Sequence, residues 1–252
     1  VGLNREQWKI SRGERMYVGE LLKNLDRIPS GVPGLDELIG GGFLPGRVYV
    51  VTGPPGSGKT TLGMQFLAEG AKNDEKGLFI ALFETPDIIV RDMLRYNLGI
   101  LEYVNSKKIV FYDLGEILLS ANRELSWDEL FKLLLEIIKR ENAKRVVIDS
   151  FSLFESFVTN PEGKKKELGR FVRKLRTMDI TTLLLSEMLS SEKYTDEYYL
   201  ADGVIVLHHF MRNYQMVRAI QILKMRGVPH DSNLKRMRFT NEGITVYKEA
   251  PI

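Results

Sequence analysis

The chain has 252 residues, 44% of them apolar and 27% charged, and its 36 basic and 33 acidic residues leave a net charge of +3. This length and apolar content suit one packed α/β unit, and so weak a charge gives no argument for nucleic acid by itself. The sequence has no cysteine and no apolar run near the ~20 residues of a membrane span, which excludes disulfides, thiolate metal sites and membrane-spanning helices. We therefore expect a cytoplasmic protein that has no membrane partner.

The N-terminal segment is polar and lacks the apolar centre of a signal peptide. We assign residues 1–27 to an N-terminal extension and residues 28–252 to a single domain. Within the extension, apolar residues from Tyr17 to Leu25 recur at helical spacing. They would either dock on a neighbouring molecule or cover the chain's own core.

From Arg47 onward, patterns typical of buried strands alternate with patterns typical of amphipathic helices. Continuous apolar runs predict strands at residues 48–52, 78–83, 108–112, 144–150 and 180–187. Helical periodicity predicts helices at residues 59–71, 84–99, 126–142 and 160–178. Such an alternation predicts an α/β fold, in which a mostly parallel central sheet is flanked by helices.

The C-terminal part changes character. Residues 203–209 and 216–227 are predicted strands joined by a polar turn at residues 212–214. Two further strands, at residues 237–240 and 244–248, follow with no helix between them. We therefore expect a C-terminal antiparallel β extension on the parallel core.

A glycine-rich turn follows the first of these strands and leads into a helix. It matches the pattern G-x-x-x-x-G-K-[ST], in which successive backbone N–H groups surround a phosphate chain. Lys59 would reach the β- and γ-phosphates and the Thr60 hydroxyl would bind Mg²⁺. The alternative is a glycine turn with a surface lysine, which the strand-to-helix context disfavours. The candidate nucleotide-binding residues are Gly53, Pro54, Pro55, Gly56, Ser57, Gly58, Lys59, Thr60 and Thr61.

A second candidate ligand follows the strand in "RVVIDS", residues 145–150. Asp149 stands at the carboxyl end of that strand, which is where open α/β sheets bind their ligands. Asp149 would hold Mg²⁺ through its water shell, and Thr60 and Asp149 are the expected metal site. An ordinary strand-end turn is the alternative.

With these motifs in this order, the chain resembles KaiC-type ATPases of the RecA superfamily. The likeness covers about residues 28–247, and it is carried by "SGVPGLDELIGGGFLPGRVYVVTGPPGSGKTT", "FIALFETP", "RVVIDSFSLF", "TTLLLSEM", "ADGVIVLHH", "ILKMRGVPH" and "NEGITVY". It implies a RecA-like P-loop NTPase that binds ATP and Mg²⁺ and assembles with nucleotide between protomers. The resemblance implies a homo-oligomer, either a ring or a filament, and a hexamer is the expected assembly. The chain looks like a single-domain archaeal relative.

The resemblance also assigns the residue that activates water. The family usually carries two consecutive glutamates in the motif F-E-E-T-P, whereas this chain reads Leu82-Phe83-Glu84-Thr85-Pro86. Phe83 therefore occupies the position of the glutamate usually taken as catalytic, and Glu84 matches the second. Adjacent strand residues point to opposite faces, so the sequence leaves two readings open. Either Glu84 is the base, or ATP is bound with very slow turnover, in which case Glu84 can be a carboxylate at the start of a helix, stabilised by the helix dipole.

In "AIQILKMRG", alternation places Ile220, Ile222, Lys224 and Arg226 on one face of a strand. From spacing alone, the two cations would be solvated charges at a strand end. The family resemblance implies that Lys224 and Arg226 instead reach the γ-phosphate of the neighbouring protomer, as arginine fingers do. His230 would line the same pocket or be an exposed histidine. The expected catalytic residues are Lys59, Glu84, Lys224 and Arg226.

Two further strand-end features leave alternatives open. Ser186 and Glu187 would sense the γ-phosphate or form an ordinary polar strand end. The segments "FSLFESFVTNPEGKKK" and "MLSSEKYTDEYYL" follow the fourth and fifth strands, where RecA-like proteins bind DNA. Lys164–Lys166 would contact nucleic acid phosphates or form a solvated helical turn, and the acidic residues of the second segment oppose DNA. A protein partner is a further expectation.

Two functions of different kind follow. The first is a ring-forming ATPase that uses Glu84, with Lys224 and Arg226 supplied in trans. The alternative is an ATP-dependent assembly or regulatory module with negligible hydrolysis. Intact Lys59, Asp149, Lys224 and Arg226 favour the first, and Phe83 favours the second.

Overall fold

The computed structural model covers most of the chain. It describes the backbone of two short strands, β1 (Trp8–Lys9) and β2 (Arg15–Met16), and, with side chains, residues 27–120, 124–158, 163–187 and 194–251. The docking segment expected from Tyr17 to Leu25 lies outside these residues.

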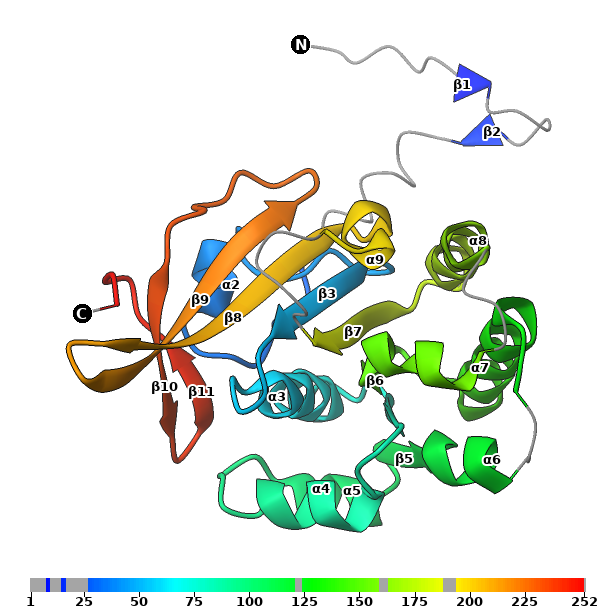
Figure 1. Cartoon of the computed structure of the whole chain (residues 1–252), viewed down its shortest axis with the longest axis horizontal. Coiled ribbons are helices and arrows are strands. Elements are labelled where there is room, and N and C mark those ends of the chain that lie inside the picture. The colour runs from blue at the N-terminus through cyan, green and yellow to red at the C-terminus, as the bar shows by residue number, and fades with distance from the viewer. Residues whose placement is uncertain are drawn as a thin grey trace.

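The centre of the molecule is a nine-stranded sheet of order β11-β10-β9-β8-β3-β7-β6-β4-β5 (Figure 1). From β8 to β5 all pairs are parallel, whereas β8–β9, β9–β10 and β10–β11 are antiparallel. The predicted mostly parallel sheet with a C-terminal antiparallel extension is confirmed. The strands are β3 (Val48–Gly53), β4 (Gly77–Ala81), β5 (Ile109–Asp113), β6 (Arg145–Asp149), β7 (Thr181–Glu187), β8 (Gly203–Arg212), β9 (Gln215–Met225), β10 (Lys235–Thr240) and β11 (Gly243–Val246).

Helices cover both faces of the sheet and bury two separate apolar cores. Alternation along the strands divides their side chains between the cores, so that Val51 packs in one and Val50 in the other. One face carries α2 (Leu35–Leu38), α3 (Lys59–Lys72), α4 (Pro86–Met93) and α5 (Ile100–Asn105). The other carries α6 (Leu114–Ser120), α7 (Trp127–Glu141), the 3₁₀ helix η1 (Phe151–Phe157), α8 (Lys164–Thr177) and α9 (Asp196–Leu200).

Several elements differ from the prediction, which also lacked the short helices α2, η1 and α9. The single helix expected at residues 84–99 ends at Met93, and a separate helix, α5, starts after Gly99, whose φ of 68° breaks helical geometry. The strand expected to reach Phe83 ends at Ala81, so Leu82–Glu84 follow it as bends. Helix α6 was not predicted, because its seven residues follow β5 directly and are too few to show a periodic pattern.

The C-terminal hairpin lies against the helix that follows the glycine-rich turn. Gln65 of α3 donates to the carbonyl oxygens of Glu242 and Ile244 and accepts from the Ile244 N–H at 2.7 Å. A Cβ on Gly58, whose φ is 107°, would come within 2.9 Å of Phe239 and of Ile244. Glycine at this position therefore lets β10 and β11 approach the start of α3.

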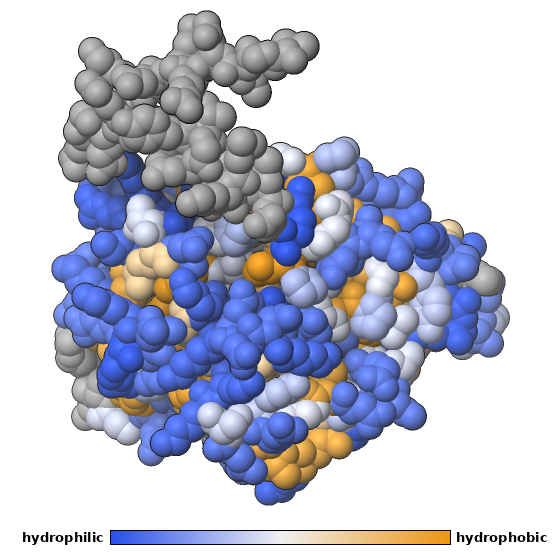
Figure 2. Space-filling view, turned by 180° about the vertical axis from the view of Figure 1, so that it is seen from behind, coloured by the Kyte–Doolittle hydropathy of each residue, from blue (hydrophilic) through white to orange (hydrophobic). Residues whose placement is uncertain are grey.

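Hydrophilic residues predominate on the face of the molecule drawn in Figure 2, and apolar residues appear between them in small groups. Within the described residues, we find no helix with the length and apolar character needed to cross a bilayer.

Candidate functional site

The glycine-rich turn joins β3 to α3 and surrounds the Lys59 side chain. The Lys59 ammonium donates to the carbonyl oxygens of Gly53, at 2.9 Å, and Pro54, at 3.2 Å. Burial lowers the pKa of Lys59, an effect opposed by the charges of Asp149 and Glu187. The hydroxyl of Ser57 is buried without a hydrogen-bond partner. The turn thus contains a buried polar group that lacks a hydrogen-bond partner, which is typical of a site that binds an anion.

The second predicted motif meets the first at the same edge of the sheet. Thr60, the second residue of α3, donates its hydroxyl hydrogen to Asp149 Oδ2 at 2.6 Å. Burial raises the pKa of Asp149 to about 6, and the hydrogen bond from Thr60 opposes that rise. The sequence-predicted metal pair is therefore in direct contact, although 89 positions separate the two residues.

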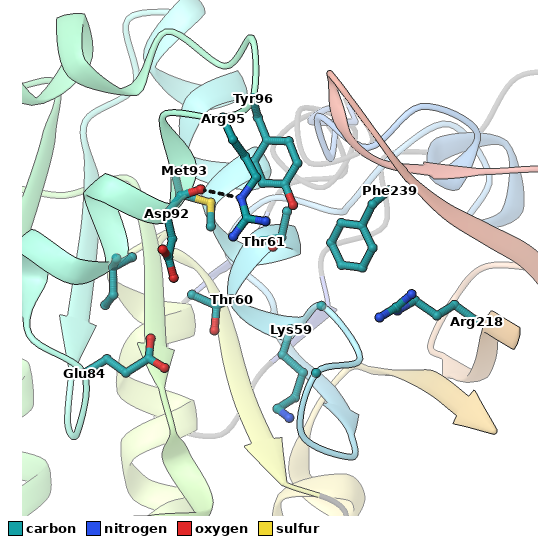
Figure 3. Close-up of a pocket in the computed structure, with 13 residues that line it drawn as sticks. Lys59, Thr60, Thr61, Glu84, Asp92, Met93, Arg95, Tyr96, Arg218 and Phe239 are labelled. Carbon is teal, nitrogen blue, oxygen red and sulfur yellow. Dashed lines mark hydrogen bonds between the residues drawn. The ribbon is translucent and has the colours of Figure 1, made fainter. Parts of the chain in front are cut away.

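A cavity of about 470 Å³ opens beside Lys59 and Thr60, and Asp149 is not among the described residues that line it (Figure 3). It brings together part of the predicted site, since the turn, the start of α3 and Glu84 all contribute. Its lining residues are Gly56, Gly58, Lys59, Thr60, Thr61, Glu84, Ile89, Asp92, Met93, Arg95, Tyr96, Arg218 and Phe239.

The two residues after Leu82 point in different directions. Glu84 lines the cavity, and its carboxylate faces Thr60 in Figure 3. Its charge also raises the pKa of Asp149, as a minor contribution beside burial. Phe83 is 60% exposed and packs on Phe157, with ring centroids 5.9 Å apart. The chain therefore presents a carboxylate on the cavity side, and the phenylalanine lies outside the cavity.

An aromatic pair at the mouth of the cavity was missed by sequence reasoning. Tyr96, which follows α4, and Phe239 of β10 lie with ring centroids 6.4 Å apart and an interplanar angle of 18°. The Arg218 guanidinium lies 5.0 Å from the Phe239 centroid, and that of Arg95 lies 5.6 Å from the Tyr96 centroid. No spacing rule joins residues so far apart in the chain, and only the fold of the C-terminal hairpin over α3 brings them together.

Lys224, Arg226 and His230 are not among the described residues that line this cavity. The backbone N–H of Arg226 donates to the Asp202 carbonyl. The backbone N–H of Asp202 in turn donates to the carbonyl of Val48, the first residue of β3. The phosphate turn begins at the other end of β3, about 16 Å away at 3.3 Å per residue. Arg226 therefore stands level with the start of β3, and Lys224, which pairs with Val204 beside Val50, stands two residues nearer to the phosphate turn.

Ile220 and Ile222 were expected to share a strand face with Lys224 and Arg226, and this prediction is wrong. Pairing of β9 with β8 shifts between Val204–Lys224 and Ile205–Ile222, so Leu223 is an extra residue. This bulge reverses the alternation, because the isoleucines pack in the core with α3 whereas Lys224 stands opposite Val204, which packs in the other core.

The bulge directs the cation pair to the end of α9. The Lys224 ammonium donates to the carbonyls of Tyr198, Tyr199 and Ala201 at 2.8, 3.0 and 2.7 Å. Burial and the adjacent Arg226 lower the pKa of Lys224. His230 lies beyond β9, and its Nδ1 is 3.1 Å from the Val228 carbonyl oxygen.

The remaining strand-end candidates are engaged inside the protein. The Ser186 hydroxyl donates to Glu197 at 3.1 Å, and Glu187 acts on the pKa of Lys59. Lys164 is only 12% exposed and forms ion pairs with Glu155 and Glu197, so it is not a solvated helical charge, whereas Lys165 and Lys166 are exposed on the first turn of α8. Parts of both loops considered for DNA binding, residues 159–162 and 188–193, lie outside the described residues.

The fold and the site define a class of protein. A glycine-rich phosphate turn that leads from a central strand into α3, with Thr60 and Asp149 in contact at the carboxyl edge of the sheet, is the arrangement of a P-loop nucleotide-binding protein of RecA type.

The comparisons with known proteins place the chain within that class. The model of the family "ATPase: KaiC" matches residues 28–251, and the chain belongs to this family. The likeness that the sequence motifs carry is thereby confirmed, and family membership supports an ATP-binding function.

Individual relatives agree with the family. The circadian clock oscillator protein KaiC of Picosynechococcus sp. is 30% identical over 238 residues, which cover 90% of this chain and 45% of that protein. The chain thus spans less than half the length of the cyanobacterial relatives it matches. A UPF0273 protein of Aeropyrum pernix is 28% identical over 89% of this chain and 95% of its own length. The crystal structure of a KaiC-like protein of Pyrococcus horikoshii superposes with a TM-score of 0.75 at 32% identity, covering 88% of this chain and 99% of that one.

Proposed function

We propose that this protein hydrolyses ATP with Mg²⁺ in a ring, expected to be a hexamer, in which Lys224 and Arg226 of one protomer complete the site of the next. The observation that carries the proposal is the separation of the candidate residues. Lys59, Thr60 and Glu84 line one cavity, whereas Lys224 and Arg226 do not line it and are held by backbone carbonyls at the end of α9. The cavity has Arg95 and Arg218 beside its aromatic pair, and assembly with a neighbour is the simplest way for Lys224 and Arg226 to reach a γ-phosphate.

The residues present fit a Mg²⁺-bound triphosphate. The buried Ser57 hydroxyl without a partner and the Lys59 ammonium, held only by backbone carbonyls, suit phosphate oxygens. Thr60 and Asp149 supply the oxygen ligands that Mg²⁺ prefers, and the described residues include no cluster of three or more metal-ligating side chains. When bound, Mg²⁺ would neutralise charge on the phosphate oxygens.

Glu84 is the candidate base. Its carboxylate lies on the cavity side of the chain, where it would accept a hydrogen bond from the attacking water and orient that water toward the γ-phosphate. The loss of the family's first glutamate does not leave the cavity without a carboxylate, because Glu84 lines it, whereas Phe83 packs on Phe157.

An assembly module with negligible hydrolysis is the second candidate. Phe83 is the observation that favours it, since the usual first glutamate is absent. In that case nucleotide would join protomers and no phosphate would be released.

Replacement of the phosphate-loop lysine tests the proposal. Lys59→Ala is expected to abolish phosphate release and to weaken ATP binding, because the only ammonium in the described lining of the cavity is removed. Lys72→Ala, at the exposed end of the same helix, is the matched control and should behave as wild type. ATP binding by wild type without phosphate release above the Lys59→Ala level would favour the assembly module.

The Asp149 carboxyl predicts a pH dependence of metal binding. Because burial raises its pKa to about 6, protons compete with Mg²⁺ below pH 6, and the apparent Mg²⁺ affinity should fall up to about tenfold per unit. By the same linkage, the apoprotein gains stability from this group at low pH and loses it as pH rises from 3.8 to about 6.

Magnesium titrations of the ADP complex between pH 5 and 8 measure this effect. Asp149→Asn removes the titrating group. The apparent Mg²⁺ affinities of the wild type and the variant, plotted against pH, should therefore converge at low pH. If the Mg²⁺ affinities of the wild type and of Asp149→Asn differ by the same factor at every pH, Asp149 does not hold the ion.

The aromatic pair predicts where the base of the nucleotide stacks. Tyr96→Ala is expected to weaken ATP binding by roughly 5- to 150-fold, because base–aromatic stacking contributes about 1–3 kcal/mol. Tyr96→Phe should bind as wild type, and affinity for inorganic triphosphate, which has no base, should not change. Equal losses of ATP and triphosphate affinity in Tyr96→Ala would contradict the stacking role.

A further inference from the structure

Helix α9 is a single turn whose position depends on side-chain ties to neighbouring elements. A helix of five residues is not stable alone. Glu197, only 1% exposed, accepts a hydrogen bond from Ser186 at the end of β7 and lies 3.5 Å from the Lys164 ammonium. These contacts fasten α9 to the carboxyl edge of the sheet.

Tyr198 of α9 extends that attachment to the phosphate turn. Its buried hydroxyl donates to Thr52 Oγ1 at 2.8 Å. Thr52 is the residue before Gly53, whose carbonyl oxygen holds the Lys59 ammonium. The strand that leads into the phosphate turn is therefore bonded directly to α9.

The other end of Tyr198 holds the cation pair. Its carbonyl oxygen accepts a hydrogen bond from Lys224 at 2.8 Å, and the neighbouring Tyr199 carbonyl accepts from Lys224 and from Arg226, at 3.0 and 3.1 Å. With the Ala201 carbonyl, all three donors of the Lys224 ammonium are bonded to the C-terminal end of α9, so Lys224 would exchange one of these bonds for a phosphate oxygen of the neighbour's nucleotide. Cations are favourable at this end of a helix.

We propose that Tyr198 is a positioning residue, which ties the trans-acting Lys224 and Arg226 to the phosphate turn of their own protomer. This inference rests on the proposed function, because it assumes that the pair acts on the neighbour's nucleotide. It adds that each protomer presents its cations from a helix fastened beside its own nucleotide site. Successive sites in the assembly are thereby mechanically connected.

Mixed assemblies of two inactive variants test the inference. The donor carries Lys59→Ala, so it supplies cations but cannot use nucleotide. The acceptor carries Arg226→Ala, so it binds nucleotide but supplies no arginine finger. Mixing them at equal concentration is expected to restore phosphate release, since acceptor sites beside donor protomers are complete.

Tyr198→Phe is then placed on one partner at a time. On the donor it should lower the restored rate of phosphate release about fivefold, because one hydrogen bond is lost. The KM for ATP should not change. On the acceptor it should change the rate less than twofold. Thr52→Val on the donor, which removes the other member of the bond, should reproduce the loss, and the two changes together should cost no more than either alone.

Tyr214→Phe on the donor is the matched control. It deletes the same group from a fully exposed tyrosine in the turn between β8 and β9, whose hydroxyl has no hydrogen-bond partner among the described residues. Thermal unfolding of each variant checks that the fold is intact. A loss confined to the acceptor, or no loss on the donor, would overturn the role of Tyr198 alone. Failure of the unmodified pair to restore any rate would overturn trans action, and with it both proposals.

Discussion

Arg226→Ala is expected to lower the rate of phosphate release by about 10³–10⁵-fold, the range over which arginine fingers act, while each protomer still binds ATP. Binding should survive because Arg226 lies beside Asp202 at the edge where β3 begins, whereas the phosphate turn follows the other end of that strand. The measurement is steady-state phosphate release together with ATP affinity by equilibrium binding.

Arg173→Ala, an exposed arginine of α8, is the matched control and should leave both quantities unchanged. Adding the Lys59→Ala protein should restore activity to Arg226→Ala, because the first supplies the finger and the second the nucleotide site. If Arg226→Ala retains the wild-type rate at saturating ATP, the cation pair has no part in the reaction.

Glu84→Gln is expected to reduce phosphate release by about 10²–10⁴-fold, the contribution of a positioned acid–base group. Glutamine keeps the size of the side chain but cannot take a proton, so ATP binding and assembly should persist. Rapid-quench measurement of a single turnover separates the chemical step from product release.

Phe83→Glu distinguishes the two glutamate positions of the family. This substitution restores the usual pair, yet it should not raise turnover, because residue 83 packs on Phe157 outside the cavity. A tenfold increase in Phe83→Glu would show that the base belongs at position 83 and that this chain has lost it, and an unchanged rate in Glu84→Gln would show that Glu84 is not the base.

Local features of the site could be predicted because they are set by short stretches of sequence. The phosphate turn needs glycines and a lysine within eight residues, and Asp149 needs only the buried strand before it. Their contact through Thr60 then follows from the parallel order of β3, β7 and β6, since parallel strands present their carboxyl ends at one edge.

The rest of the site depends on contacts that no local pattern encodes. A bulge at Leu223 moved Lys224 to the opposite face, because one extra residue reverses the alternation of a strand. The stack of Tyr96 on Phe239 requires the C-terminal hairpin to fold over α3. Lys164 looked like a solvated charge, yet it is held by Glu197, which follows more than thirty residues later in the sequence.

The most direct test of the account is phosphate release from Mg·ATP per protomer, measured across protein concentrations with particle size determined in the same samples. Trans action predicts that the rate per protomer rises with the assembled fraction and is absent in Lys59→Ala at every concentration. A rate per protomer that does not change as assembly proceeds would contradict a site completed by its neighbour. Assembly with ATP but no phosphate release would contradict hydrolysis itself.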